Sequence, residues 1–198
     1  MKMKKKIDPN LIIAIGVLIA SFSALFVYMK QASIMSDQTE ILLEQTKANA
    51  WPRLSIETDL NWIDKKLESL KIKIHNKGTG PALVEGVRVT YDSVYIRSWA
   101  DLFDKVNVPD SISTSISNKT IYNTVLSANE NYYWLRLIHD PNLARWLYNH
   151  REKITIEICY RSVFKDYWLL TVDKNGYNTT KKLDTPESPL PSDEMFKS

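Results

Sequence analysis

Three patterns of hydrophobic and polar residues follow one another along the chain. From Leu11 to Met29 the sequence is apolar, with no charge and no proline. As a helix, this run would cover roughly 28 Å, close to the thickness of a bilayer's hydrocarbon core. Its Leu, Ile, Val and Phe residues together favour insertion by roughly 3–7 kcal/mol. We therefore predict a transmembrane helix over residues 11–29, preceded by a cytoplasmic segment of residues 1–10.

A cleaved signal peptide is the alternative interpretation of this run. The run is longer than the usual apolar region of about 7–15 residues, and no clear small-x-small cleavage motif follows it. No cysteine stands there for lipid attachment. An uncleaved anchor is the favoured interpretation.

Residues 30–50 predict a stalk helix that continues out of the bilayer, because they contain good helix formers and neither Gly nor Pro. Ile34, Ile41 and Ala48 recur every seven residues, with glutamines between them. This spacing is typical of a short coiled coil, through which copies of the chain could associate. A stalk helix that rests on its own domain is the alternative. Pro52 ends the helix, since the residue before a proline is pushed out of the α region.

From Arg53 onward apolar residues recur at every second position, as in strands with one buried face. The pattern predicts strands over residues 54–58, 70–75, 87–91, 120–126, 132–138, 154–160 and 167–172.

Two short helices interrupt the predicted strands. Ser98 caps the first, with Asp101 placed for a box-like cap, and Asp140 caps the second ahead of a proline. Short strands separated by turn signals indicate a mainly β fold, either an antiparallel sandwich or a barrel. An immunoglobulin-like β-sandwich over residues 51–173 is the favoured interpretation. The prolines, serines and charged residues that follow predict a flexible tail over residues 174–198.

The segment IHNKGTGPALV is the stretch that most resembles a binding loop. A phosphate loop needs free backbone N–H groups that lead into a helix, whereas Pro81 removes one donor and a strand pattern follows. No Lys-Ser/Thr pair follows the second glycine. Asn76, Gly78, Gly80 and Pro81 are instead typical of a structural turn, in which we expect the glycines to adopt positive φ.

Charge sets the expected orientation of the span. Lys2, Lys4, Lys5 and Lys6 precede the span, and Lys30 is the nearest basic residue after it. The positive-inside bias therefore keeps the N-terminus in the cytoplasm and exports the rest of the chain. The net charge of +3 is slight, so nucleic acid is not an expected partner.

The residue types that carry catalysis are sparse and unpaired. The three histidines, His75, His139 and His150, have ordinary structural interpretations, and no His-x-x-x-His or Cys-x-x-Cys spacing occurs. No Gly-x-Ser-x-Gly elbow is present, and the single cysteine, Cys159, is interpreted as a packed side chain. We expect no catalytic, cofactor-binding or metal-binding residues, and therefore no enzyme.

Aromatic residues are numerous for a domain of this size. The set comprises Trp99, Tyr132, Tyr133, Trp134, Trp146, Tyr148, Tyr167 and Trp168. Core packing is the favoured interpretation, since such residues bring large apolar groups with one polar handle. A peptide- or sugar-binding surface is the alternative.

Several segments together resemble a group of uncharacterised bacterial single-pass membrane proteins. The segments are AWPRLSI, NKGTGPALVEGVRV, RSWADLF, VLSANENYYWLRL and ICYRSVFKDYW, and the resemblance covers roughly residues 38–170. Members of that group carry a β-rich domain with an Asn-x-Gly-x-Gly-Pro-Ala turn after one N-terminal span. The resemblance implies no activity.

These observations together predict a single-pass inner-membrane protein whose C-terminal domain faces the cell-envelope space. Its expected function is binding or assembly with an unknown envelope protein, without catalysis. The alternative is a self-associating membrane effector in stress or phage defence. An envelope hydrolase is disfavoured by the absent motifs.

Overall fold

The computed structural model describes residues 8–106, 108–109, 112, 116–184 and 190–197. The chain divides into two compact units, Met1–Ala48 and Asn49–Ser198. The first is built on one long helix. The second contains all the described strands and the shorter helices.

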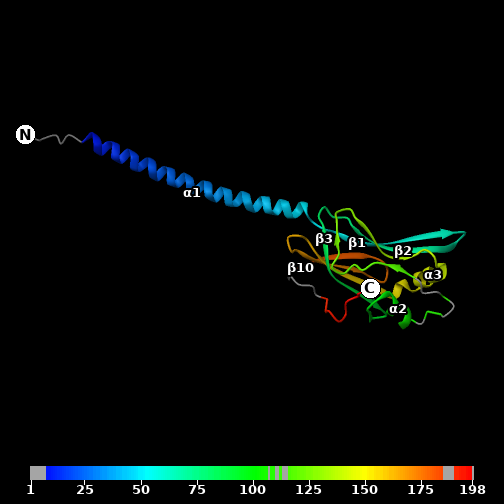
Figure 1. The fold of residues 1–198 in the computed structure, drawn as a ribbon. Coiled ribbons are helices and arrows are strands. Elements are labelled where there is room, and N and C mark those ends of the chain that lie inside the picture. Colours follow the sequence, from blue (N-terminus) through cyan, green and yellow to red (C-terminus); the bar gives the residue numbers. More distant parts are fainter. Residues whose placement is uncertain (1–7, 107, 110–111, 113–115, 185–189, 198) are drawn as a thin grey trace, which may run out of the picture. The chain divides into compact units, whose positions relative to one another are not determined.

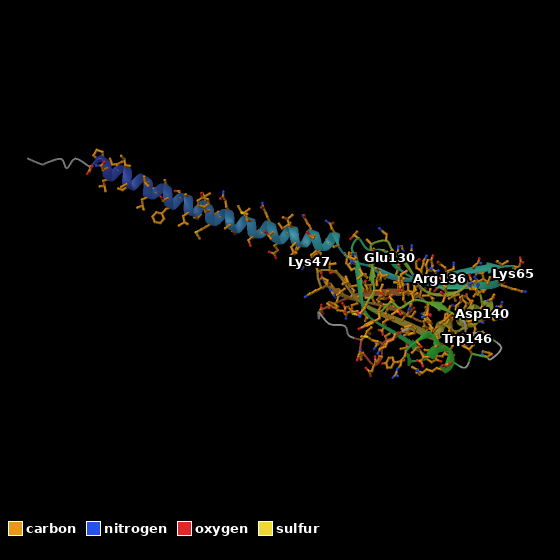
Figure 2. All side chains as sticks on the ribbon, viewed as in Figure 1. Lys47, Lys65, Glu130, Arg136, Asp140 and Trp146 are labelled. Carbon is orange, nitrogen blue, oxygen red and sulfur yellow. The ribbon has the colours of Figure 1, made fainter. Side chains whose placement is uncertain are left out.

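Helix α1 (Pro9–Asn49) covers both the apolar run and the segment after it. It begins after Asp8, whose side-chain oxygen accepts a hydrogen bond from the N–H of Asn10 at 3.0 Å. None of its residues is buried, and its side chains project all around the helix (Figure 2). The helix is long and apolar enough to cross a membrane. It ends just ahead of Trp51 and Pro52, where the sequence predicts its end.

The second unit consists of two antiparallel sheets (Figure 1). The first sheet has the order β1 (Leu54–Ile63), β2 (Lys66–Asn76), β7 (Asn131–Leu137) and β5 (Ser117–Asn118). The second has the order β10 (Asn178–Leu183), β9 (Tyr167–Val172), β8 (Ile154–Arg161), β3 (Ala82–Tyr91) and β4 (Val94–Ile96), with β6 (Val125–Leu126) also paired with β3.

The apolar sides of both sheets contribute to one buried core. Ile74 on β2, Val87 on β3 and Ile158 on β8 are all fully buried in the same cluster. The alternation of apolar and polar residues therefore has the predicted consequence, because every second side chain points inward. The antiparallel two-sheet arrangement agrees with the predicted β architecture, and the immunoglobulin-like topology stays a prediction.

Three helical segments complete the second unit, namely α2 (Trp99–Lys105), α3 (Pro141–His150) and the 3-10 turn η1 (Arg151–Lys153). Both predicted caps are confirmed. The Ser98 hydroxyl accepts from the N–H of Asp101 at 3.0 Å, and the Asp140 carboxylate accepts from that of Leu143 at 2.9 Å. These bonds satisfy N–H groups that the first helical turn leaves unpaired.

The strand predicted over residues 120–126 is mostly wrong, because only Val125 and Leu126 are in a strand. Asn123 adopts a left-handed conformation with φ of 57° and donates its N–H to the carbonyl of Val84 at 3.1 Å. A turn therefore replaces the first part of the predicted strand. Asparagine tolerates this conformation better than most residues.

The flexible tail predicted over residues 174–198 is also wrong for the residues described there. β10 pairs along its whole length with β9. Further on, Phe196 is only 1% exposed, and its ring lies 5.2 Å from the rings of both Trp99 and Trp134. Its N–H also bonds to the carbonyl of Val87 at 2.8 Å. Burial of one large aromatic side chain outweighs the polar, proline-rich composition around it.

Replacement of Phe196 by alanine should therefore destabilise the second unit by about 3–5 kcal/mol, the usual effect of deleting a buried aromatic ring. Urea unfolding of the full chain in detergent, followed by tryptophan fluorescence, measures the change. Lys197→Ala is the control, since its side chain is exposed next to Phe196. Equal unfolding midpoints for the two variants would show that the ring contributes nothing to the core.

Candidate functional site

The predicted structural turn lies between β2 and β3, which belong to different sheets. Its backbone donors are all used inside the protein. The N–H of Lys77 bonds to the carbonyl of Arg53, and those of Thr79 and Gly80 bond to the carbonyl of Trp51. The N–H of Gly78 bonds to the side-chain oxygen of Asn76 at 3.0 Å. None of these four groups is left to bind a phosphate.

Close packing, not backbone conformation, explains the two glycines. A Cβ atom on Gly78 would lie 2.2 Å from the carbonyl oxygen of Trp51, and one on Gly80 would lie 2.1 Å from that of Ala50. The expectation of positive φ at these positions is wrong, because Gly176 is the only described glycine with positive φ. The turn needs glycine because another backbone segment passes directly against it.

Asn76 is fully buried and connects three segments of the domain. Its side-chain oxygen also accepts from the N–H of Arg53 at 3.1 Å. Its amide donates to the carbonyls of Gly80, Leu126 and Ser127 at 2.8, 3.1 and 3.1 Å. Every polar atom of this buried side chain therefore has a partner, as a buried amide requires.

The other residues considered for chemistry lie apart. Cys159 is buried on β8, and His139 is exposed just before α3. The Nδ1 atom of His150 lies 2.8 Å from the carbonyl oxygen of Trp146, and the two rings stack. Among the described residues, no group of three or more His, Cys, Asp or Glu side chains is arranged to hold a metal ion.

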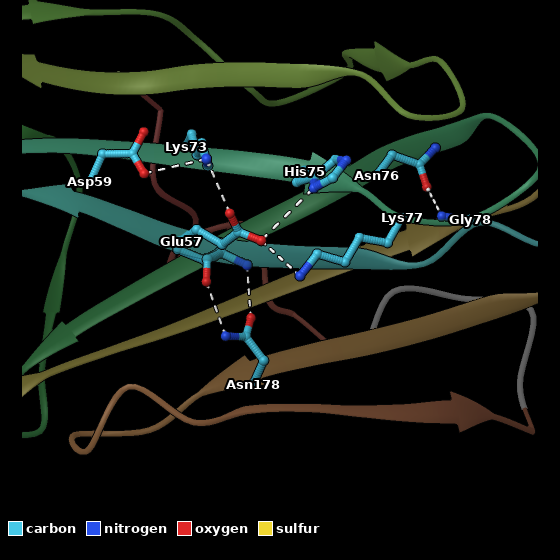
Figure 3. A network of polar contacts seen from close by, with 9 residues as sticks. Glu57, Asp59, Lys73, His75, Asn76, Lys77, Gly78 and Asn178 are labelled. Carbon is cyan, nitrogen blue, oxygen red and sulfur yellow. Dashed lines mark hydrogen bonds and ion pairs between the residues drawn. The ribbon is translucent and has the colours of Figure 1, made fainter.

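A cluster of ion pairs covers the outer face of β1 and β2 (Figure 3). The Glu57 carboxylate lies 2.7 Å from Nζ of Lys77 and 3.1 Å from Nζ of Lys73, and His75 approaches it at 3.8 Å. Hydrogen bonds from Lys77 and Lys73 lower the pKa of Glu57 from 4.5 to about 2. Glu57 is therefore a weak base that cannot exchange protons efficiently near neutral pH.

The free edge of β1 is one part of a candidate binding site. β1 is the end strand of its sheet and pairs only with β2 among the described strands. At the start of β1, side chains of the same protein form hydrogen bonds with the backbone groups of this free edge. The N–H of Leu54 donates to the hydroxyl of Tyr160 at 3.4 Å. The side chain of Asn178 bonds to both the N–H and the carbonyl of Ile56, at 2.7 and 3.0 Å (Figure 3).

A cavity of about 550 Å³ opens beside the next part of this edge. Thr58 and Leu60 on β1 line it, together with apolar residues of β2, α3, β8 and β9. The apolar lining residues are Ile56, Leu60, Leu70, Ile72, Leu147, Ile154, Ile156 and Val172. Its size and apolar lining are those of a pocket that binds a ligand.

Tyr148 and Arg151 line this cavity, and Trp62 packs against Tyr148 outside the lining. The rings of Trp62 and Tyr148 meet edge to face, with their centres 5.6 Å apart. The Arg151 guanidinium lies over the Tyr148 ring, 4.1 Å from its centre, and donates to the Tyr148 carbonyl at 2.7 Å. Although the Trp62 ring packs against Tyr148, 48% of the surface of Trp62 is exposed. We call these three residues the aromatic wall.

Charged side chains of both signs line the cavity: the cations Arg151 and Lys174 and the carboxylates Glu57 and Asp173. Arg151 forms an exposed ion pair with Glu152 at 3.5 Å, whereas Lys174 forms none with any described residue. The acidic lining residues are already engaged. Glu57 pairs with lysines, and one oxygen of Asp173 accepts from the N–H groups of Asn175 and Tyr177, both at 2.9 Å.

Sequence reasoning missed most of this site. The alternation of residues predicts β1 but stops at Thr58, whereas the strand continues to Ile63. Trp62 and its position near a hairpin turn were the available signal, since a large aromatic residue beside a tight turn is difficult to bury. The position of β1 at a sheet edge depends on long-range pairing, which no local pattern reports.

Introducing one methyl group at the turn should reveal the close backbone approach. We expect Gly80→Ala to destabilise the second unit by about 1–3 kcal/mol, because the new Cβ would collide with backbone that cannot rotate away. Thr79→Ala is the matched control, because Thr79 is exposed and adjacent. Unfolding midpoints in urea make the comparison, and indistinguishable variants would contradict this explanation of the glycine.

The lowered pKa of Glu57 predicts a specific dependence of stability on pH. A carboxyl group whose pKa is lower in the folded state stabilises it above pH 4.5, and loses this effect as the pH falls to about 2. The stability difference between the native protein and Glu57→Gln should therefore shrink over that range. In a Lys73→Gln/Lys77→Gln background, the pH-dependent part should be smaller. A difference that is constant with pH would refute the assignment.

No protein-family model matches the chain, and no curated protein or solved structure is significantly similar to it.

Proposed function

We propose that the chain is a membrane-tethered binding module whose partner docks at the cavity beside β1. The observation that carries this proposal is the aromatic wall next to an apolar cavity. Trp, Tyr and Arg are the side chains that most often dominate the energy of protein interfaces, especially when they border a pocket. Trp62 is half exposed here, although burial would stabilise so large a side chain.

The proposed tether is α1, which is long and apolar enough to cross a membrane. The lysines before the apolar run favour a cytoplasmic N-terminus, so the two-sheet unit would face the envelope space of a bacterial cell as a single-pass inner-membrane protein. A tether raises the local concentration of the binding unit near membrane partners, so that even a modest affinity suffices.

Binding without catalysis accounts best for the polar groups. The Glu57 carboxylate is held in the ionised state by two lysines, and the N–H groups of the glycine turn are consumed internally. The cavity itself is lined mainly by apolar side chains. Such a surface favours recognition of another molecule over transfer of a proton or a group.

A second candidate function is self-association through α1, as in a membrane effector of stress or phage defence. Past the apolar run, Ile34 and Ile41 are 53% and 54% exposed and lie seven residues apart. In water, burial of these two apolar side chains favours packing of α1 against a second helix.

Site-specific photocrosslinking in living cells tests both functions. A photoreactive benzoylphenylalanine in place of Trp62 should give a crosslinked species with a partner, whereas the same group at Tyr122 should not. Tyr122 is 40% exposed and belongs neither to the aromatic wall nor to the cavity lining, so it controls for exposure. The group at Ile41 tests self-association, which predicts a product of twice the chain's mass. Equal crosslinking at Trp62 and Tyr122 would overturn the proposed binding surface.

A further inference from the structure

We propose that β1 accepts an extended peptide as an additional strand along Thr58 and Leu60, with an apolar side chain of that peptide in the neighbouring cavity. The inference rests on the proposed binding function and names its ligand class. The ligand is a peptide segment with alternating apolar and polar residues and an acidic residue at one end.

The backbone N–H and carbonyl groups of β1 point either toward β2 or away from it. In an antiparallel pair, residues alternate between those bonded to the partner strand and those whose N–H and carbonyl point away from it. Ile56 belongs to the second kind, because its N–H and carbonyl both bond to Asn178 on the far side from β2. The register with β2 is regular from Leu54 to Asn61. The N–H and carbonyl groups of Thr58 and Leu60 therefore also point away from β2.

The free edge begins where the protein's own side chains stop. Asn178 takes the place of a paired strand at Ile56, and the Tyr160 hydroxyl does so at Leu54. No described residue forms a hydrogen bond with the outward backbone groups of Thr58 and Leu60. An unpaired strand edge is a template for another chain, and proteins usually block it. Here it is blocked at one end and open beside the cavity.

The cavity fixes which side chains the added strand would carry. Side chains of a strand alternate between the two faces of its sheet, so every second residue of the peptide would point toward the cavity. This face is apolar. The other face continues the surface that holds Asp59 and Lys73, which form an ion pair at 3.3 Å. A matching peptide therefore alternates apolar and polar residues.

Charge complementarity selects the acidic end. Arg151 and Lys174 are the lining cations, and the lining carboxylates Glu57 and Asp173 are already bonded within the protein. Lys174 forms no ion pair with any described residue, and the pair that Arg151 forms with Glu152, at 3.5 Å, is exposed to solvent. A ligand carboxylate beside Arg151 would compete with the exposed Glu152 pair and accept the guanidinium hydrogen bonds that the Tyr148 carbonyl leaves available. An acyl chain could fill the cavity, but it would leave the outward backbone groups of Thr58 and Leu60 without a partner.

The experiment selects peptides on the full chain held in phosphatidylcholine nanodiscs, with a phage library of random decapeptides as the probe. Thr58→Pro removes the outward N–H and obstructs an added strand, yet it keeps the ladder with β2 because that N–H does not bond to β2. Thr58→Ala is the matched control, which retains the N–H. Urea unfolding verifies that both variants fold.

Strand addition predicts that enriched peptides alternate apolar and polar residues and carry an acid near one end. Their affinity should fall about tenfold or more for Thr58→Pro and stay within about twofold for Thr58→Ala. N-methylation of every second peptide residue should lower the affinity comparably in only one of the two possible sets of positions. In that set the methyl groups replace the N–H hydrogens that face β1. Arg151→Glu should abolish the preference for acidic peptides.

Three results would overturn the inference. Equal affinity for the two Thr58 variants would exclude strand addition, and crosslinking at Trp62 would still establish a partner at the cavity. Failure to enrich any peptide over a parallel selection on Thr58→Pro would exclude a peptide ligand. A dimer in nanodiscs that Thr58→Pro dissociates would assign the edge to a second copy of the chain. If the native protein shows neither peptide binding nor a crosslinked partner at Trp62, the proposed function itself is rejected.

Discussion

The buried amide of Asn76 is the interaction on which the arrangement of the two-sheet unit depends. Its oxygen holds the segment that leads into β1, and its NH2 group holds Leu126 at the end of β6 and Ser127 just after it. Since β2 ends at Asn76 and β3 begins six residues later in the other sheet, the same amide also directs the crossing between sheets. Close contact with Ala50 and Trp51 is possible only because Gly78 and Gly80 have no side chain.

This junction has a consequence at the opposite end of β1. With Arg53 fixed beside Asn76, β1 starts level with the end of β2 and lies at the edge of its sheet. The strand then runs past the part of the second sheet that reaches it through Asn178. Beyond this contact the inner sides of the two sheets no longer close on each other, and the apolar core continues into the cavity. The core and the proposed binding surface are thus parts of one apolar layer.

Local patterns predicted those features that local physics determines. The apolar run, the helix caps at Ser98 and Asp140, and most strands follow from periodicity and capping within a few residues. The sequence pattern predicts the glycine turn between strands but gives the wrong reason for its glycines, because contact with Trp51 involves residues distant in the sequence. Local composition predicts a flexible tail around Phe196, because its partners Trp99 and Trp134 lie far away in the sequence. The edge position of Thr58 has the same long-range origin.

The open part of β1 is also short, and its ends are defined. Asn178 occupies Ile56 on one side, and a β-bulge interrupts the register between Asn61 and Trp62 on the other. An uninterrupted edge lets incoming strands slide and lets identical molecules stack without limit, which is the route to fibrils. A window with two outward-facing residues permits neither sliding nor continuous growth. The same geometry that exposes the strand therefore protects the protein from aggregation through this edge.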